Sequence, residues 1–277
     1  MSYKTIVVHL DCGSRRGERL DLAVRFAEEF DAHLIGLFAL DLYVGMPMAA
    51  DAGSVLVETE LKRRESCMRE AQEEFFTKCT SLAAKPEWHF TDEDAVTEVA
   101  IAAHSADLVV IGQTHPETCA DDGVRASFDS EVVLTAGKPV LIVPYAGHFE
   151  RVGKRTMVAW NAAREAGRAL TDSLPVLERS ASVELVSFEE NGAQGPAEEE
   201  ARSAVRIYLE DHGVNATIRR YVGEELTAGE LILAHAHDED ADCIVMGAYG
   251  NSQMERPAQG ATRTVMKFMT VPVIMSH

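Results

Sequence analysis

The sequence predicts an α/β protein built from two consecutive domains, each with an open parallel sheet covered by helices on both faces. Its 277 residues correspond to about two domains of roughly 100–200 residues each. Short apolar runs alternate with helical segments of ten or more residues, which is typical of parallel β-α-β units. In addition, two stretches of the first half recur in the second. DLVVIG at 107–112 returns as DCIVMG at 242–247, and KPVLI at 138–142 returns as VPVIM at 271–275.

The first half begins with a strand at 5–10, a β-branched run closed by DCGS, which signals a turn and a helix start. Over 18–30, apolar side chains recur at spacings of three and four, which indicates a helix. Residues 41–54 form a loop rich in Gly, Pro, Met and Ala; it either packs on its own domain or serves as a lid or partner contact. The same criteria predict strands at 33–40, 88–90, 108–111 and 139–143 and helices at 55–81 and 94–103.

A linker is expected at 145–153, after which the order of elements repeats. We therefore assign the two domains to residues 1–147 and 153–277. The second domain starts with a strand at 156–160 that ends at Asn161. Its remaining elements are helices at 164–178, 198–212 and 226–236 and strands at 183–188, 216–222, 243–246 and 271–275, with an amphipathic segment after Gly260.

A formal net charge of −19 argues against nucleic acid or an anionic membrane as partner, because either needs a basic patch. No apolar run approaches the roughly 18–20 residues of a membrane span, and the short run before Asp11 is no signal peptide. We expect a cytoplasmic protein. No CxxC pair is present, which favours reduced, buried thiols over a disulfide framework. The cysteines are Cys12, Cys67, Cys79, Cys119 and Cys243.

A glycine loop near the end of the chain has the pattern of an anion site. The apolar run at 243–246 ends in Gly247 and Gly250, and a polar loop leads to the sequence Gly260-Ala261-Thr262. Backbone amides at a helix start hold anions, and glycines let a ligand approach the backbone closely. Glycine after a parallel strand is also ordinary turn chemistry. The repetition of the pattern within the chain favours the functional interpretation.

The two halves together resemble the universal stress protein family in its tandem, two-domain form. The resemblance lies in an early strand ending in Asp or Asn and a late strand, glycine loop, helix and strand ending in Pro-Val. It is carried by VVHLDCGSRRGERLDLAVRFA, VAWNAAREAGRALTDSLPVL and VMGAYG…GATRTVMKFMTVPVIMSH, and covers nearly the whole chain. It implies two Rossmann-like domains, each with a five-stranded parallel sheet in the order 3-2-1-4-5. Ligands then bind where the order reverses, at the carboxyl ends of strands 1 and 4.

The resemblance also implies a stress-response regulatory or binding protein with a nucleotide site in its second domain. In nucleotide-binding members, an acidic residue at the end of strand 1 lies by the adenosine, and a Gly-x2-Gly-x9-Gly-Ser/Thr motif wraps the ribose and phosphates. Asn161 takes the acidic position here, and Gly247 and Gly250 match the first two glycines. The remaining expected ligand-binding residues are Gly260, Ala261 and Thr262. ATP or AMP is the implied ligand, with Mg²⁺ accompanying the phosphates.

The second-half loop departs from the family motif. Counted forward, Ala261 stands where the hydroxyl residue is expected; counted back from Pro272, Thr262 takes that position and Gln259 replaces the glycine. Pro257 within the loop is also unusual.

The first half departs further, although Asp11 is present. Gly112 is followed by Gln113-Thr114-His115 without a second glycine, and Asp129 stands at the hydroxyl position. Carboxylates there repel phosphates. We expect that the first copy does not bind nucleotide as the family does.

Two other functions stay open. A non-nucleotide ligand or a protein partner could bind through the inter-domain cleft and the 41–54 loop. A slow ATP hydrolase is the second alternative, but the loop has Arg256 as its only base and no Gly-Lys-Ser/Thr follows. Efficient phosphoryl transfer needs such charge stabilisation. We therefore expect no catalytic residues, and at most a weak ATPase.

The run His235-Ala-His237-Asp-Glu-Asp240 contains metal-ligand types. Residues two apart on a helix do not share a face, so we interpret this run as a solvated helix end and expect no metal site.

The fifth strands, 139–143 and 272–275, are expected at sheet edges. Because family members pair through these strands, the resemblance implies pairing of the two halves within the chain, which also protects the exposed edges. Whether two chains associate into a homodimer stays open.

Overall fold

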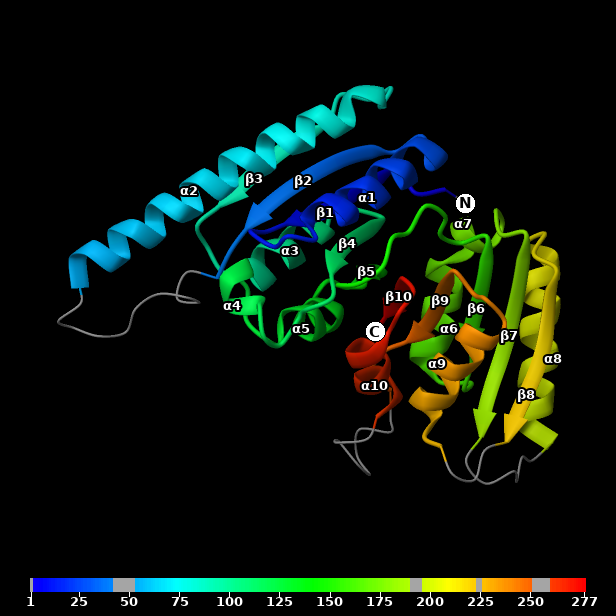
Figure 1. Cartoon of the computed structure of the whole chain (residues 1–277). Helices are drawn as coiled ribbons and strands as arrows, with labels where there is room; N and C mark the ends of the chain where they lie inside the picture. Colours follow the sequence, from blue (N-terminus) through cyan, green and yellow to red (C-terminus); the bar gives the residue numbers. More distant parts are fainter. Residues whose placement is uncertain (1, 42–52, 190–195, 223–225, 251–259) are drawn as a thin grey trace. The chain divides into compact units, whose positions relative to one another are not determined.

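The computed structural model describes residues 2–41, 53–189, 196–222, 226–250 and 260–277 (Figure 1). Residues 42–52 of the predicted 41–54 loop lie outside this range, as do Arg256, Pro257 and Gln259. The described residues form two compact units, Ser2–Lys138 and Pro139–His277. This division by contacts precedes the expected linker, and the assignment of domains to 1–147 and 153–277 stays a prediction.

The first unit contains four parallel strands in the order β3-β2-β1-β4. They are β1 (Thr5–Leu10), β2 (His33–Ala39), β3 (Glu87–Thr91) and β4 (Leu108–Gly112). The helices are α1 (Arg16–Phe30), α2 (Gly53–Lys78), the 3₁₀ turn η1 (Cys79–Ser81), α3 (Ala95–Ala103), α4 (Cys119–Asp122) and α5 (Phe128–Thr135). Right-handed crossovers put α1 and α2 on one face of this sheet and α3 on the other. The packing of α1 against α2 and of α3 against α5 agrees with this arrangement (Figure 1).

Local signals explain where these elements end. Asp31 follows α1 in the left-handed region, with φ of 51°, and its N–H donates back to the last turn of the helix. The Asp94 side chain accepts a hydrogen bond from the N–H of Thr97 at 2.9 Å and so caps the start of α3. Such a cap satisfies an amide that the helix leaves unpaired.

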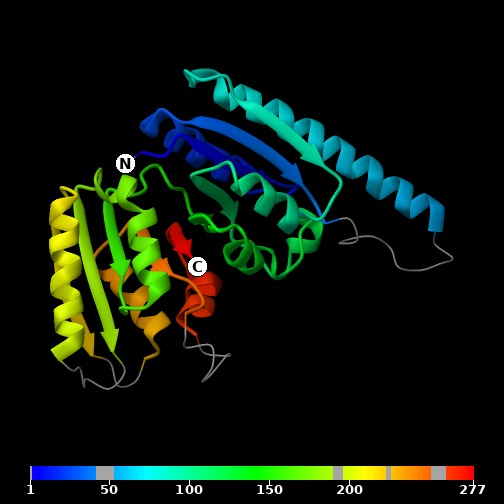
Figure 2. The ribbon, with the colours of Figure 1, turned by 180° about the vertical axis from the view of Figure 1, so that it is seen from behind.

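The second unit contains six strands in the order β5-β10-β9-β6-β7-β8. They are β5 (Val140–Val143), β6 (Arg155–Ala159), β7 (Ser182–Glu189), β8 (Ala216–Val222), β9 (Cys243–Gly247) and β10 (Val273–Ser276). Its helices are α6 (Arg164–Asp172), α7 (Leu174–Leu177), α8 (Pro196–Asp211), α9 (Ala228–Asp238) and α10 (Ala261–Phe268). Strands β6 to β10 are parallel neighbours with helices on both faces (Figure 2). The predicted α/β class with mostly parallel sheets is confirmed.

The predicted helix at 164–178 is two helices. α6 ends at Asp172 and α7 begins at Leu174, with Ser173 between them. Pro175 explains the break, because proline has no N–H to donate and its ring collides with the carbonyl four residues earlier.

Strand β5 pairs with β10 in antiparallel register, with Val140 opposite Met275 and Ile142 opposite Val273. All four residues of each strand are buried. The expected pairing of the two fifth strands is therefore found, and it explains why β5 belongs to the second compact unit.

Within the described ranges, no helix combines the length and the apolar character that crossing a membrane requires.

Candidate functional site

A pocket in the second unit lies where the carboxyl ends of the neighbouring strands β6 and β9 meet the start of α10. Five of the six residues expected to bind a ligand line it: Asn161, Gly247, Gly250, Ala261 and Thr262. The sixth, Gly260, is the residue before α10 and is not among the lining residues. This edge of the sheet is the point where strand order reverses, since β6 lies between β7 and β9.

Gly247 is required by packing as well as by any ligand. A Cβ atom there would lie 2.5 Å from the backbone nitrogen of Ala166 and 2.5 Å from the carbonyl carbon of Glu165. The start of α6 therefore presses directly on β9, and only glycine fits. At Gly250 the nearest atom to such a Cβ is the Glu165 Oε2, at 3.1 Å, a side-chain end that can move.

Two residues without a glycine's freedom adopt left-handed backbone beside this pocket. Ala162 has φ of 57° and Tyr249 has φ of 53°, a conformation costly for residues with a Cβ. Each sits in a hydrogen-bonded turn. The Asn161 Oδ1 accepts from the N–H of Ala163 at 3.1 Å, and the N–H of Tyr249 donates to the Thr262 Oγ1 at 3.1 Å. Strained backbone held in this way clusters at ligand sites.

Thr262 thus stabilises the glycine turn. Its hydroxyl oxygen accepts from the glycine turn, and the side chain is only 8% exposed. A threonine hydroxyl also carries one proton that it can donate, and Thr262 lines the pocket. The first amides of α10 have no partner within the helix, and this end carries the positive pole of the helix dipole.

The charged side chains around the pocket give little stabilisation to a bound anion. None of its described lining residues is Lys or Arg. The Glu165 carboxylate lies next to Gly250, and its charge is partly offset by Arg164, whose Nε lies 3.3 Å from Oε1. Highly charged phosphate chains are therefore opposed at this glycine.

The pocket also has an apolar part and an unused donor. Phe188, Ile232 and Met246 line it together with Trp160. Trp160 is 9% exposed, and its buried indole N–H has no hydrogen-bond partner in the part of the chain that the structure describes. Buried donors without partners are uncommon, and sequence reasoning did not single out this residue.

The first unit has an ion pair where the second has a pocket. Arg19 on α1 is buried, and its Nη2 lies 2.8 Å from the Asp11 Oδ1. A Cβ on Gly112, at the end of β4, would lie 2.3 Å from the Arg19 Nη1. Burial raises the pKa of Asp11, but Arg19 and neighbouring donors outweigh it and hold this pKa below its usual value. Burial lowers the pKa of the adjacent His9 to about 4, so that its ring is neutral.

The position that would offer a hydroxyl in the first unit is occupied by Asp129. Its carboxylate accepts from the N–H of Thr114 at 3.0 Å and from the N–H of Ser130 at 2.7 Å. Burial raises the pKa of Asp129 to about 6. Arg19 and Asp129 thus make internal polar contacts at the strand ends of the first unit. That this unit does not hold nucleotide as the family does stays a prediction.

A second ion cluster, also missed by sequence reasoning, lies near the end of β2. The Arg125 Nη1 lies 2.9 Å from Asp41 Oδ1 and also contacts Asp94, and its Nη2 lies 2.7 Å from Glu131 Oε2. The cluster anchors the start of α3 and α5.

Two expectations from the sequence are wrong: the solvated helix end that includes His235, and the absence of a disulfide. His235 is not solvated: it is 8% exposed, and its Nε2 lies 2.7 Å from the Glu184 Oε2 on β7. The helix turns this residue inward while His237 stays outside. No group of three or more His, Cys, Asp or Glu side chains suited to a metal occurs within the described residues.

The cysteines are not all reduced. Cys12 and Cys67 form a disulfide across 55 positions of sequence, while Cys79, Cys119 and Cys243 are free and buried. The packing of α2 beside α1 brings the two half-cystines together. No spacing motif could have indicated this pair.

Comparison with known proteins gives the family. A sequence profile of the universal stress protein family matches residues 2–144. A universal stress protein from Archaeoglobus fulgidus DSM 4304 has a similar structure over 98% of this chain and 95% of its own, with a TM-score of 0.69 and 16% identity. A functionally unknown protein from Pseudomonas aeruginosa PAO1 is similar over 99% and 92%, with a TM-score of 0.58 and 16% identity. A search of curated proteins finds no match. Since the matching profile spans more than half of the sequence, the chain belongs to the universal stress protein family.

Proposed function

We propose that the protein is a stress-response binding protein whose second unit holds an adenine nucleotide. The observation that carries this proposal is the convergence of the end of β6, the glycine turn after β9 and the start of α10 on one pocket. Membership of the universal stress protein family supports the same ligand class. The strained turns at Ala162 and Tyr249 support a ligand site rather than an ordinary loop.

The pocket suggests how the ligand lies. Phe188, Ile232 and Met246 offer an apolar surface for the base, and the Trp160 indole N–H offers a donor without a competing partner among the described residues. The α10 start faces the phosphate end. The described walls enclose a volume of about 90 Å³. This volume holds only part of the base, and the phosphates of the bound nucleotide then lie near the glycine turn.

Phosphate number follows from the same geometry. Glu165 next to Gly250 disfavours a long phosphate chain, so AMP is the better-fitting ligand and ATP the weaker one. Mg²⁺ would reach the site through the phosphates of ATP.

The test is a calorimetric titration of the full chain with AMP and with ATP, each in the presence and in the absence of Mg²⁺. We expect one nucleotide per chain. Gly250→Val places a branched side chain against the Glu165 carboxylate and should remove binding with little loss of stability. Gly167→Ala on α6 is the matched control, because its added Cβ meets only Trp160, at 3.9 Å.

Retained affinity in Gly250→Val would contradict the assigned site. Absence of binding by the natural sequence at millimolar nucleotide would contradict the proposed function itself.

A further inference from the structure

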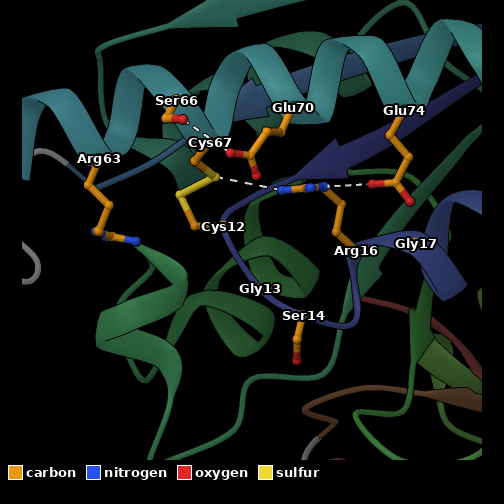
Figure 3. A pocket seen from close by; sticks show the side chains of 10 residues that line it. All are labelled: Cys12, Gly13, Ser14, Arg16, Gly17, Arg63, Ser66, Cys67, Glu70 and Glu74. Carbon is orange, nitrogen blue, oxygen red and sulfur yellow. Dashed lines mark hydrogen bonds and ion pairs between the residues drawn. A yellow bond between two sulfur atoms is a disulfide. The ribbon is translucent and has the colours of Figure 1, made fainter.

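A second pocket, of about 470 Å³, lies in the first unit beside the Cys12–Cys67 disulfide. Figure 3 shows both sulfurs at its wall, with Arg16 and Glu74 on one side and Arg63 on the other. From this arrangement we infer a site for reversible thiol–disulfide exchange with a small thiol that carries carboxylate and ammonium groups. The inference does not depend on nucleotide binding, because every residue it uses lies in the first unit.

The two sulfurs have different surroundings. Cys12 is half-buried in the loop after β1, whereas Cys67 on α2 is only 8% exposed. An incoming thiolate therefore reaches the Cys12 sulfur first. Attack on one sulfur makes the other the leaving group, and a stabilised leaving thiolate departs faster.

Arg16 is placed to stabilise that leaving group. Its Nη1 lies 3.6 Å from the Cys67 Sγ. The guanidinium is held in position by the Glu74 Oε2, 3.0 Å from Nε, and by the Asp11 carbonyl oxygen, 3.0 Å from Nη1. A neighbouring arginine lowers the pKa of a cysteine and favours its thiolate.

The exchange balances in two steps. In the first, the thiolate of the small thiol forms a bond to the Cys12 Sγ, the bond between Cys12 and Cys67 breaks, and Cys67 leaves as a thiolate beside Arg16. In the second, another thiolate attacks the small-thiol sulfur of the mixed disulfide, and Cys12 leaves as a thiolate. Two small thiols are oxidised to their disulfide, and the protein disulfide is reduced to two thiols; the reverse sequence oxidises the protein.

The charges of the pocket indicate the class of thiol. The Arg16 Nη2 has no partner within the described residues, and Arg63 uses three of its five N–H donors on Glu60 and the Asp121 carbonyl. Both guanidinium groups can therefore donate hydrogen bonds to a carboxylate. Glu70, an exposed lining residue, offers an oxygen to an ammonium group. The volume lies within the range of small-molecule pockets, roughly 300–1,000 Å³.

The experiment compares glutathione, which is zwitterionic, with 2-mercaptoethanol, which is neutral, as reductants of the oxidised full chain. Rates are measured by acid quenching and intact-mass analysis at equal thiolate concentrations. We expect saturation with glutathione and a linear dependence with 2-mercaptoethanol. Arg63→Met should slow the glutathione reaction about fivefold, the upper range for one partly exposed ion pair, and leave the 2-mercaptoethanol rate unchanged.

Arg69→Met is the matched control. Arg69 lies on the same helix, pairs with Glu65 and does not line the pocket, so both rates should stay at the wild-type values. Separately, Cys67→Ser incubated with oxidised glutathione should carry one glutathione on Cys12 and none on the buried Cys119.

Three results would overturn the inference. Five free thiols in protein prepared without reductant would show that the disulfide does not form. Linear glutathione kinetics that Arg63→Met leaves unchanged would remove the binding site. Modification of Cys119 in place of Cys12 would misplace the attacked sulfur. If Cys67→Ser does not fold, the two arginine variants, which keep both cysteines, still decide the question.

Discussion

Replacement of Glu165 by glutamine should strengthen nucleotide binding, because it removes a carboxylate that lies beside Gly250. We take about 6 Å as the separation between the Glu165 Oε2 and a phosphate oxygen bound at the Gly250 backbone, where an added Cβ would lie 3.1 Å from that carboxylate oxygen. At that separation two unit charges repel by about 0.7 kcal/mol in water and by about 3 kcal/mol at an effective dielectric constant of 20. Arg164, 3.3 Å from the other carboxylate oxygen, offsets part of this repulsion. A net gain of about 1 kcal/mol, or about fivefold in affinity, remains.

Calorimetric titration of wild type and Glu165→Gln with adenosine, AMP and ATP measures this gain. Adenosine carries no phosphate, so its affinity should not change, whereas AMP should bind about fivefold tighter and ATP should gain at least as much. Arg164→Gln is the complementary variant and should weaken both nucleotides. An equal gain for adenosine and AMP would show that Glu165 acts through shape or packing, and no gain for either nucleotide would show that the phosphates lie elsewhere. Both results refute the placement of phosphate at this turn.

Other predictions concern the buried polar groups. Arg19→Met leaves Asp11 charged and unpaired, so urea unfolding should show a loss of about 3–5 kcal/mol, which the double variant with Asp11→Asn should largely restore; a small loss in the single variant would contradict the pairing. Because the pKa of Asp129 is raised to about 6 from 3.8, the native state keeps a proton that the unfolded state releases, and stability should fall by about 3 kcal/mol as pH rises from about 3 to about 7. Asp129→Asn should lack this slope, and an unchanged slope would exclude Asp129 as its source. Trp160→Phe should weaken AMP binding about threefold to tenfold, the value of one hydrogen bond, with stability nearly unchanged since the indole N–H has no partner among the described residues; unchanged affinity would remove this donor from the site.

The order of elements could be predicted because it depends on local patterns. The strand at 5–10 and the glycine after 243–246 follow from β-branched runs and turn residues, and both are found. The division of the 164–178 helix could also have been predicted, because Pro175 interrupts a helix at this position. Local chemistry of this kind needs no knowledge of the partner elements.

The site was predictable only in part. The spacing of Gly247 and Thr262 placed them in one loop, and they do line one pocket, but the packing of α6 on Gly247 depends on a helix some 80 positions earlier in the chain. The ion pair between Arg19 and Asp11 could be predicted only with knowledge of where the long Arg19 side chain on α1 points. The Cys12–Cys67 bond requires the tertiary packing of α2. Distances between elements, rather than patterns within them, decide these contacts.

The antiparallel pairing of β5 with β10 has a consequence for biogenesis. Ile142 meets Val273, and 273 minus 142 gives 131 positions that must be synthesised before the pair can form. Until then β5, four apolar residues that are all buried in the native state, presents an open strand edge to solvent and to other nascent chains. Contacts this distant slow folding, and exposed edges invite aggregation in the interval. Burial of β5 therefore depends on timely translation of the second half. Ribosome stalling between these two strands should leave an aggregation-prone intermediate that depends on chaperones.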